Sequence, residues 1–232
     1  MIISHKHKFI FLKPRKVAGT SVELALAAHC GAEDIVTPVS DYSAEADDDR
    51  YEQAPRNYEA LGFYNHMEPA AVRERVGAAV WDSYYKLTVV RNPWDLMVSK
   101  YWWDVALAQR GSVSQAAADG HVATANRPKQ LGLVSKIRKK MALRLGDFNG
   151  YVRQSVKVFG NTTFYFWPDG GEVCDFYIRY ENLNEDYRRA GERLGMPVVE
   201  LPRTKNKSRS DQQHYSEYYD TKTAKLVGEI FA

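Results

Sequence analysis

The stretch FIFLKPRKVAGTSVELAL, residues 9 to 26, decides the fold. It begins with a short apolar run, continues through a small basic loop and passes into a second, mostly apolar segment that starts with Thr and Ser. This order predicts a buried strand, a turn and a helix. The N-terminus of a helix presents unpaired backbone N–H groups, which bind anions such as phosphate. The stretch therefore predicts an anion-binding loop over residues 16 to 21.

The residue order in this loop differs from that of the usual triphosphate-binding loop. In the usual loop the lysine follows the second glycine, and the next Ser or Thr binds magnesium. Here Lys16 precedes Gly19. Gly19 allows close backbone approach, while Thr20 and Ser21 add hydroxyl donors. The sequence has no apolar strand ending in Asp that would complete a magnesium site. We interpret the loop as one that binds a phosphate whose chemistry needs no metal.

A second strand-to-helix turn follows residues 84–90. The run YYKLTVV is predicted as a buried strand, and a helix is predicted to begin near Trp94 and to continue to Gln109. Arg91 stands at the carboxyl end of the strand, where a guanidinium can hold a phosphate with two N–H groups. Ser99 lies in the second turn of the helix, so its hydroxyl can reach the same anion. The alternative for Arg91 is a structural ion pair with Glu181.

The rest of the chain alternates predicted strands with predicted helices. Such alternation is typical of an α/β fold, so we predict a single domain over residues 1–232 with a central, mostly parallel sheet flanked by helices. Sheets of this kind bind ligands at the carboxyl ends of their strands. Gly31 is the predicted cap of the first helix. Further helices are predicted over 68–77, 147–156, 184–195 and 221–231, and a hairpin or two short strands over 162–183.

The composition indicates which kinds of partner and which cellular compartment to expect for the protein. The formal net charge of +3 is too small to favour nucleic acid, although it suits small anionic ligands. Two cysteines do not make a disulfide framework. The sequence has no apolar run long enough for a signal peptide or a membrane span. The expectation is therefore a cytoplasmic protein without a membrane span.

The two turns together resemble the donor-binding elements of sulfotransferases that use 3′-phosphoadenosine 5′-phosphosulfate (PAPS). KVAGTS, residues 16–21, is similar to the 5′-phosphosulfate loop of that family, although Ala18 stands where glycine is more common. VVRNPWDLMVSKYW, residues 89–102, is similar to its 3′-phosphate element. DFYIRYENLNEDY, residues 175–187, and KNKSRSDQQHYSEYYD, residues 205–220, resemble segments of the Golgi-type and related bacterial carbohydrate sulfotransferases.

The resemblance implies a P-loop-like fold and a transferase. A sulfuryl group would pass from PAPS to an acceptor hydroxyl, with a carbohydrate as the leading acceptor class, and adenosine 3′,5′-bisphosphate (PAP) would be left. Lys16 is the candidate cation for the leaving phosphate oxygen. The resemblance also implies the donor-binding residues, which are Lys16, Val17, Ala18, Gly19, Thr20, Ser21, Arg91, Ser99, Lys205, Lys207 and Ser208.

The parts of the chain with the least resemblance are residues 34–58 and 106–147, where such enzymes usually carry acceptor-specific insertions. The second of these includes the basic run KIRKKMALR, residues 136–144. We interpret this run as a solvated helix face. The alternative is that it binds an anionic acceptor.

The candidate general base is His66. It lies just before the predicted helix 68–77 and between the two phosphate-binding turns. In the branch that the chain resembles, a histidine in this place is the catalytic base. An imidazole with a pKa near 6.5 suits proton abstraction at neutral pH. Glu68 is the second candidate, either as the base or as the group that orients His66. The alternative for His66 is an ordinary helix-capping or surface residue.

Two other functions stay open on the sequence. The first is a nucleotide or small-molecule kinase with a degenerate phosphate loop, which would need magnesium and an acidic metal ligand near the second strand. The second is a non-catalytic nucleotide-binding scaffold, in which the loops bind PAP and His66 is dispensable. Nucleotide binding with and without magnesium distinguishes the kinase, and a sulfate-transfer assay distinguishes the scaffold.

Overall fold

The computed structural model describes residues 1–39, 55–109, 147–158, 160–197, 199–202 and 213–231. The chain falls into two compact units. Unit 1 comprises Met1–Val90 and Asn161–Thr204, and unit 2 comprises Arg91–Gly160 and Lys205–Ala232. The single domain over 1–232 stays a prediction. So does the acceptor role of 34–58 and 106–147, most of which lies outside the described residues.

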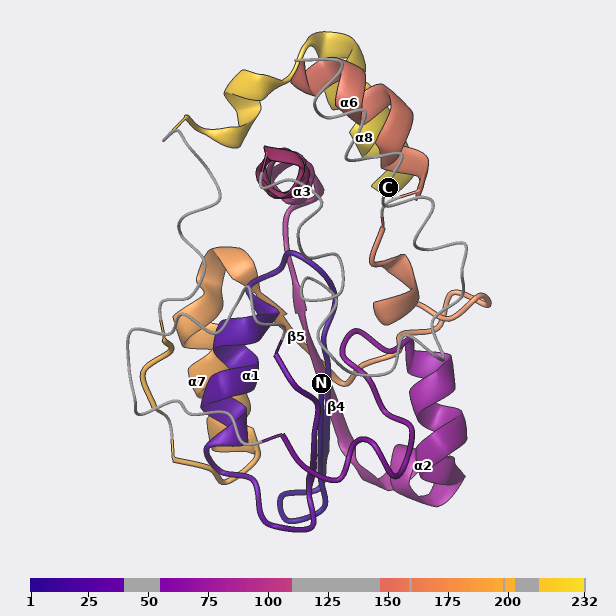
Figure 1. The fold of residues 1–232 in the computed structure, drawn as a ribbon, viewed down its shortest axis with the longest axis vertical. Helices are drawn as coiled ribbons and strands as arrows, with labels where there is room; N and C mark the ends of the chain where they lie inside the picture. Colours follow the sequence, from indigo (N-terminus) through magenta and orange to yellow (C-terminus); the bar gives the residue numbers. More distant parts are fainter. Residues whose placement is uncertain (40–54, 110–146, 159, 198, 203–212, 232) are drawn as a thin grey trace. The chain divides into compact units, whose positions relative to one another are not determined.

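Unit 1 is built on a five-stranded sheet whose strand order is β3-β1-β2-β4-β5. Strands β2, β4 and β5 run parallel, while β1 is antiparallel to both β2 and β3. The predicted α/β class is therefore confirmed, as a mixed sheet flanked by helices (Figure 1). The strands are β1 Ile2–Ser4, β2 Phe9–Leu12, β3 Ile35–Val36, β4 Tyr85–Val90 and β5 Phe176–Arg179.

The sheet is mixed, and not mostly parallel, because of the first hairpin. Only residues 5–8 separate β1 from β2, and a parallel crossover needs a dozen residues or more. The turn is held by Asp34, whose carboxylate accepts hydrogen bonds from the His5 N–H at 2.7 Å and the Lys6 N–H at 3.1 Å. These bonds join residues 28 and 29 positions apart, which no local pattern in the sequence indicates.

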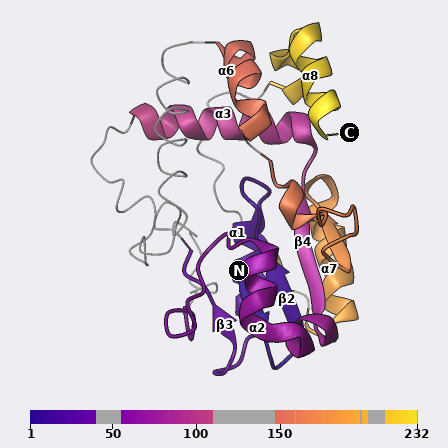
Figure 2. The same ribbon diagram turned by 90° about the vertical axis from the view of Figure 1, so that its right-hand side faces the viewer.

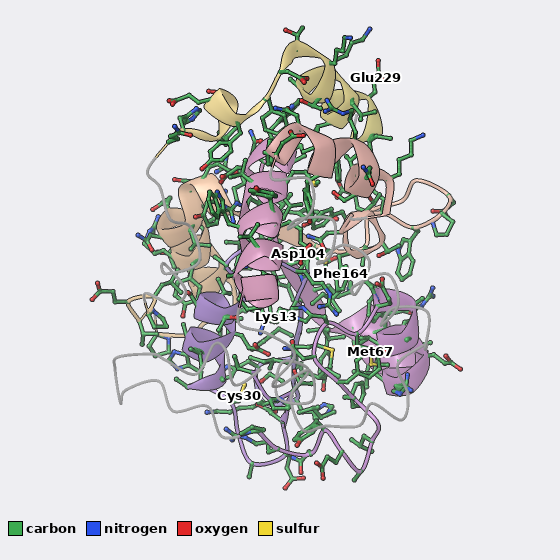
Figure 3. All side chains as sticks on the ribbon, turned by 45° about the horizontal axis from the view of Figure 1, so that its top comes forward. Lys13, Cys30, Met67, Asp104, Phe164 and Glu229 are labelled. Atoms are coloured by element: carbon green, nitrogen blue, oxygen red, sulfur yellow. The ribbon has the colours of Figure 1, made fainter. Side chains whose placement is uncertain are left out.

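Three helices cover the sheet of unit 1. Figure 1 shows α1 and α7 on one side of the strands and α2 on the other. Alternate residues of β2 face opposite sides, so Ile10 and Leu12 pack with Met67 in the core cluster that includes residues of α2 (Figure 3). The bounds of these helices are α1 Gly19–Ala27, α2 Pro69–Ser83 and α7 Leu183–Arg193.

The predicted helix ends differ from those observed. As predicted, Pro69 lies in the first turn of α2, but α2 continues to Ser83 beyond a non-helical residue, Gly77, with a φ of 77°. The prediction of Gly31 as the cap of α1 is wrong, because the helix ends at Ala27. The Gly31 N–H instead donates to a carboxylate oxygen of Asp34 at 2.8 Å.

The segment from 162 to 183, predicted as a hairpin or two short strands, contains one strand, a tight turn and the 3-10 helices Thr162–Phe164 and Tyr180–Asn182. The Trp167 N–H donates to the Gly171 carbonyl at 2.7 Å, and a single antiparallel bridge joins Phe166 to Glu172 before β5 begins. At the end of β5 the Arg179 guanidinium pairs with Asp186 of α7, with contacts of 2.7 and 2.9 Å. Arg179 therefore ties the end of β5 to α7.

Unit 2 is helical. As predicted, helices occupy α3 Pro93–Gln109, α6 Phe148–Ser155 and α8 Thr221–Phe231, and α6 and α8 lie against α3 (Figure 2). Tyr101 of α3 contacts Phe148 and Tyr151 of α6 edge-on. The Trp94 indole donates to the Ala224 carbonyl at 3.0 Å. Within the described residues, none of the helices has the length and apolar character needed to span a membrane.

Candidate functional site

The loop of residues 13–18, here called the anion loop, connects the end of β2 to the first residue of α1. Two of its residues have left-handed backbone conformations, Lys16 with a φ of 65° and Ala18 with a φ of 62°. Ala18 is the N-cap residue of α1, and its methyl side chain cannot accept a hydrogen bond from the first turn. The first N–H groups of α1 therefore have no side-chain acceptor from the N-cap residue. This turn belongs to the segment 16–21, for which the sequence predicts anion binding.

Burial differs between the residues predicted to bind the donor. Lys16 and Ala18 are half-buried, whereas Val17 is fully buried and Thr20 and Ser21 are nearly so. Val17 therefore anchors the middle of the anion loop in the core, between the two left-handed residues.

Position 19 requires a glycine because another side chain lies very close to its Cα atom. A Cβ atom on Gly19 would lie 2.9 Å from the Cγ atom of Lys13, which is closer than real Cβ contacts. The sequence predicts that Gly19 lets the backbone approach an anion, which stays a prediction, and in the structure the Lys13 side chain is a close neighbour of this glycine. Any larger residue at position 19 would have to displace Lys13, whose charged end is buried.

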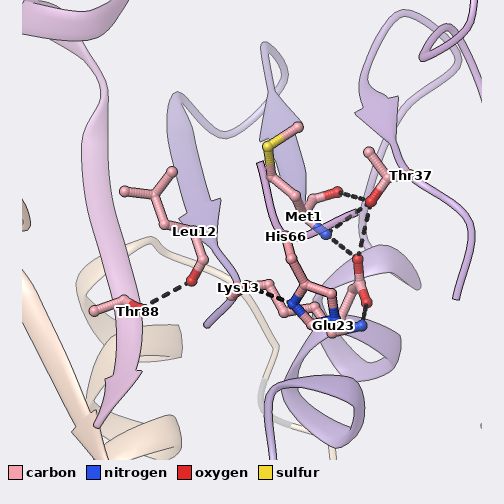
Figure 4. A network of polar contacts seen from close by, with 7 residues as sticks. All are labelled: Met1, Leu12, Lys13, Glu23, Thr37, His66 and Thr88. Carbon is pink, nitrogen blue, oxygen red and sulfur yellow. Dashed lines mark hydrogen bonds and ion pairs between the residues drawn. The ribbon is translucent and has the colours of Figure 1, made fainter. Parts of the chain in front are cut away.

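A buried charge network lies beneath the anion loop. The Lys13 side chain is 3% exposed and forms an ion pair with Glu23 of α1, which is fully buried (Figures 3 and 4). Glu23 also contacts the Met1 amino group and the Thr37 hydroxyl. Burial raises the pKa of the Glu23 carboxyl, but the charges of Lys13 and the Met1 amino group outweigh it, so this pKa is lowered overall. Glu23 is therefore ionised at neutral pH.

This network was not predicted from the sequence. Glu23 stands alone as a charged residue within the apolar run VELALA, and Lys13 directly follows the apolar β2 strand. Each of these is a weak signal of a buried ion pair, because charged residues are almost never fully buried unless they are paired. Together they could have indicated it.

His66 contacts the strand end from which the anion loop begins. Its Nδ1 atom donates to the Lys13 carbonyl oxygen at 2.8 Å, across 53 residues of sequence (Figure 4). In a neutral imidazole that donates from Nδ1, the Nε2 atom carries the lone pair. Nε2 has no hydrogen-bond partner among the residues that the structure describes. The structure therefore brings the predicted base to Lys13, three residues before the predicted loop 16–21, and the basic nitrogen of His66 is not bonded to the described part of the protein.

The electrostatic surroundings keep His66 neutral. Burial lowers its pKa well below the ordinary value of 6.5, and the nearby positive charges of Arg15 and Lys13 lower it further. His66 also has a left-handed backbone with a φ of 61°. Left-handed backbone outside glycine is uncommon and concentrates at functional sites. Lys16, Ala18 and His66 are three of the five such residues described in this chain.

Glu68 does not orient His66. Its carboxylate accepts a hydrogen bond from the Thr163 hydroxyl at 2.5 Å. The group that orients the imidazole is instead the Lys13 backbone carbonyl. The sequence could not indicate this, because backbone carbonyls are present at every position.

Arg91 and Ser99 belong to unit 2. The Arg91 guanidinium contacts the Asp95 carboxylate through Nε at 2.9 Å and Nη2 at 2.8 Å. The ion pair with Asp95 is thus a structural role for Arg91 with a partner that was not predicted, and the pairing with Glu181 stays a prediction. Asp95 and Ser99 are four residues apart in α3 and so share a helix face, whereas Arg91 lies two residues before the helix begins. Ser99 is half-buried, and its hydroxyl has no hydrogen-bond partner among the described residues.

Three predicted donor-binding residues, Lys205, Lys207 and Ser208, lie outside the described residues, as does the basic run 136–144. Within the described residues, no group of three or more His, Cys, Asp or Glu side chains is arranged to hold a metal ion.

No protein-family model matches the chain, and no curated protein or solved structure matches it significantly. The candidate site is therefore argued from its own residues.

Strain at Ala18 leads to a prediction about stability. A left-handed conformation costs a non-glycine residue about 1–2 kcal/mol. Glycine relieves this cost but increases the entropy of the unfolded chain, which offsets about 0.4–1 kcal/mol. Ala18→Gly should therefore raise the free energy of unfolding by about 0.5–1 kcal/mol in urea titrations. In the matched control Ala79→Gly, on the exposed face of α2, glycine should instead lower it by about 1 kcal/mol. A destabilising Ala18→Gly would contradict the left-handed assignment.

Proposed function

We propose that the protein binds PAPS and transfers its sulfuryl group to an acceptor hydroxyl. The observation that carries this proposal is the hydrogen bond between His66 Nδ1 and the Lys13 carbonyl oxygen. That contact puts a neutral imidazole beside the loop that resembles a 5′-phosphosulfate loop. A candidate base and a candidate anion site therefore meet at the end of one strand, which is where α/β sheets bind their ligands.

The residues of unit 1 fit the 5′ end of this donor. The anion loop turns through two left-handed residues, and α1 begins without a side-chain cap, so its first backbone N–H groups suit an anion. Lys16 would neutralise the leaving phosphate oxygen, because an ammonium is a compact positive charge. The donor, when bound, supplies an activated sulfuryl group attached to that phosphate.

His66 would take the proton of the acceptor hydroxyl at Nε2. Its lowered pKa means that the neutral, proton-accepting form is already present at pH 7. The Lys13 carbonyl fixes the tautomer, since a carbonyl can only accept and Nδ1 must therefore carry the proton. The resemblance favours a carbohydrate as the acceptor.

Binding of PAP tests the donor half of the proposal. PAP should bind in the presence of a chelator, and AMP should bind more weakly because it lacks the 3′-phosphate. Arg91→Ala should weaken PAP by about 1.5–3 kcal/mol, the usual contribution of a charge-assisted hydrogen bond. Isothermal titration calorimetry measures all three.

The ion pair between Arg91 and Asp95 provides a more specific test of whether Arg91 binds the 3′-phosphate. If Arg91 binds the 3′-phosphate, it must share its guanidinium with Asp95. Asp95→Asn should then tighten PAP binding and leave AMP binding unchanged. Equal affinities for PAP and AMP in the wild type would contradict the role of Arg91 and Ser99.

Two rival functions give different results in the same experiments. A kinase with a degenerate loop should bind ATP in a magnesium-dependent manner and should not prefer PAP. A non-catalytic scaffold should bind PAP but transfer no sulfate from PAPS to any acceptor in a panel of sugars. Sulfate transfer that depends on His66 is the result that supports the enzyme over both rivals.

A further inference from the structure

One buried side chain is hydrogen-bonded to both polar backbone groups of Arg15, in the anion loop. The Asn161 Nδ2 atom donates to the Arg15 carbonyl at 2.9 Å, and the Arg15 N–H donates to Asn161 Oδ1 at 3.2 Å. Asn161 is 2% exposed, and 146 residues separate it from Arg15. Because donor and acceptor are both engaged, the carboxamide sets the position and the orientation of the Arg15 backbone.

Asn161 is itself held by the core. The backbone carbonyl of Asn161 accepts a hydrogen bond from the Phe164 N–H at 2.8 Å. The Phe164 side chain is 4% exposed and belongs to the main core cluster. Thr163, two residues after Asn161, donates to Glu68 at 2.5 Å. The short segment 161–163 therefore contacts both the anion loop and Glu68, the N-cap residue of α2, which lies two residues after His66.

The anion loop needs such support. Lys16, immediately after Arg15, and Ala18 both adopt left-handed conformations that persist only where the surrounding structure enforces them. Buried Val17 constrains the loop from the side of the core. The Asn161 carboxamide constrains it on the chain-entry side, at the residue before the first left-handed position.

We propose that Asn161 is a positioning residue, which holds the anion loop in its ligand-binding conformation and at a set place relative to the His66 segment. This role rests on the proposed function, because it assigns the held loop to the 5′-phosphosulfate group. Asn161 does not contact the donor in this scheme. It acts through the Arg15 backbone, so that the loop amides are already oriented before the anion arrives.

The test compares Asn161→Ala with Asn57→Ala. Asn57 is a matched control in the same unit, because its carboxamide also bonds to backbone groups, the Ala32 carbonyl at 2.7 Å and the Asp34 carbonyl at 3.0 Å. Amide hydrogen exchange of residues 16–19 reports on the loop without any ligand. Calorimetry with PAP reports on anion binding by the folded protein.

In Asn161→Ala, exchange of these amides should become about tenfold faster and PAP binding about tenfold weaker, a change of the size that loss of one net hydrogen bond produces. Asn57→Ala should change neither. In the Ala18→Gly background the loss of PAP affinity caused by Asn161→Ala should be smaller, since a loop with less strain needs less enforcement. If Asn161→Ala does not fold, Asn161→Asp serves instead, because it keeps the acceptor for the Arg15 N–H and loses the donor.

Three results would overturn the proposal. In the first, exchange of the loop amides is unchanged in the Asn161 variant. In the second, exchange accelerates but the affinity for PAP stays at the wild-type value. In the third, the wild type binds no PAP, which overturns the proposed function and the positioning role with it, while the exchange rates still decide whether Asn161 holds the loop.

Discussion

His66→Ala should lower the turnover of sulfate transfer by about 10²-fold or more, because general-base catalysis typically contributes about 10²–10⁴-fold. The affinity for PAP should stay nearly unchanged, since Nε2 would contact the acceptor and not the nucleotide. His66→Gln and His66→Asn keep much of the side-chain shape but lack the basic nitrogen, so both should be slow. Steady-state rates with saturating PAPS, together with calorimetry for PAP, measure the two effects separately.

The control for this prediction is His5→Ala. His5 is an exposed histidine of the same unit, and it contacts the Tyr84 hydroxyl at 2.8 Å. Its removal should leave turnover unchanged. Near-normal turnover of His66→Ala on a true acceptor would place the base elsewhere, and Glu68 would be the next residue to test.

The pH dependence of the rate follows from the lowered pKa of His66. Burial and the charges of Arg15 and Lys13 disfavour the protonated form, so the rate should rise with pH through a value below 6.5 and be level at neutral pH. Stability should change in the same direction. The unfolded chain takes up a proton near pH 6.5 that folded His66 resists, so the protein loses stability as the pH falls below about 6.5. His66→Gln should reduce this loss.

Glu23→Ala should lower the free energy of unfolding by about 3–5 kcal/mol, because it leaves the buried Lys13 ammonium without its partner. Urea unfolding followed by circular dichroism measures this change. Glu74→Ala, at an exposed position of α2, is the control and should have an effect of less than about 0.5 kcal/mol.

A double variant separates the charge from the packing. Glu23→Leu combined with Lys13→Met removes both side-chain charges and keeps side chains of similar length. The Met1 amino group loses Glu23 but keeps the Thr37 hydroxyl as a partner, so the double variant should recover part of the stability that Glu23→Ala loses. The contribution of the ionised Glu23 carboxylate is present above the ordinary Glu pKa and is lost as the pH falls through its lowered value. A loss below about 1 kcal/mol in Glu23→Ala would be that of a solvent-exposed pair and would contradict the burial described for this network.

The elements that the sequence predicts correctly are those with a strong local pattern. The apolar strands β2 and β4 follow from short apolar runs, and the helices α2, α3 and α7 begin within one residue of the predicted positions. The pairing of β1 with β3 was not predictable. These strands have three and two residues, which is too short for a periodicity to be recognised.

One local feature was predictable and was missed. Arg91 and Asp95 are four residues apart at the start of a helix, the spacing at which opposite charges pair. The partner predicted from the sequence was Glu181, and that pairing stays a prediction. The spacing of four residues is the signal for the ion pair with Asp95 that the structure describes.

By itself, the sequence determined the order of strand, basic loop and helix, the glycine at position 19 and the presence of a histidine before α2, since each depends on neighbouring residues. Tertiary structure alone decided which groups meet at the anion loop: the Lys13 carbonyl and His66, Lys13 and Glu23, and Arg15 and Asn161. The physical reason is that these contacts join residues 10, 53 and 146 positions apart. They form only when the sheet and its covering helices pack and exclude water. Burial makes an unpaired charge or amide energetically unfavourable, so each buried group needs a partner.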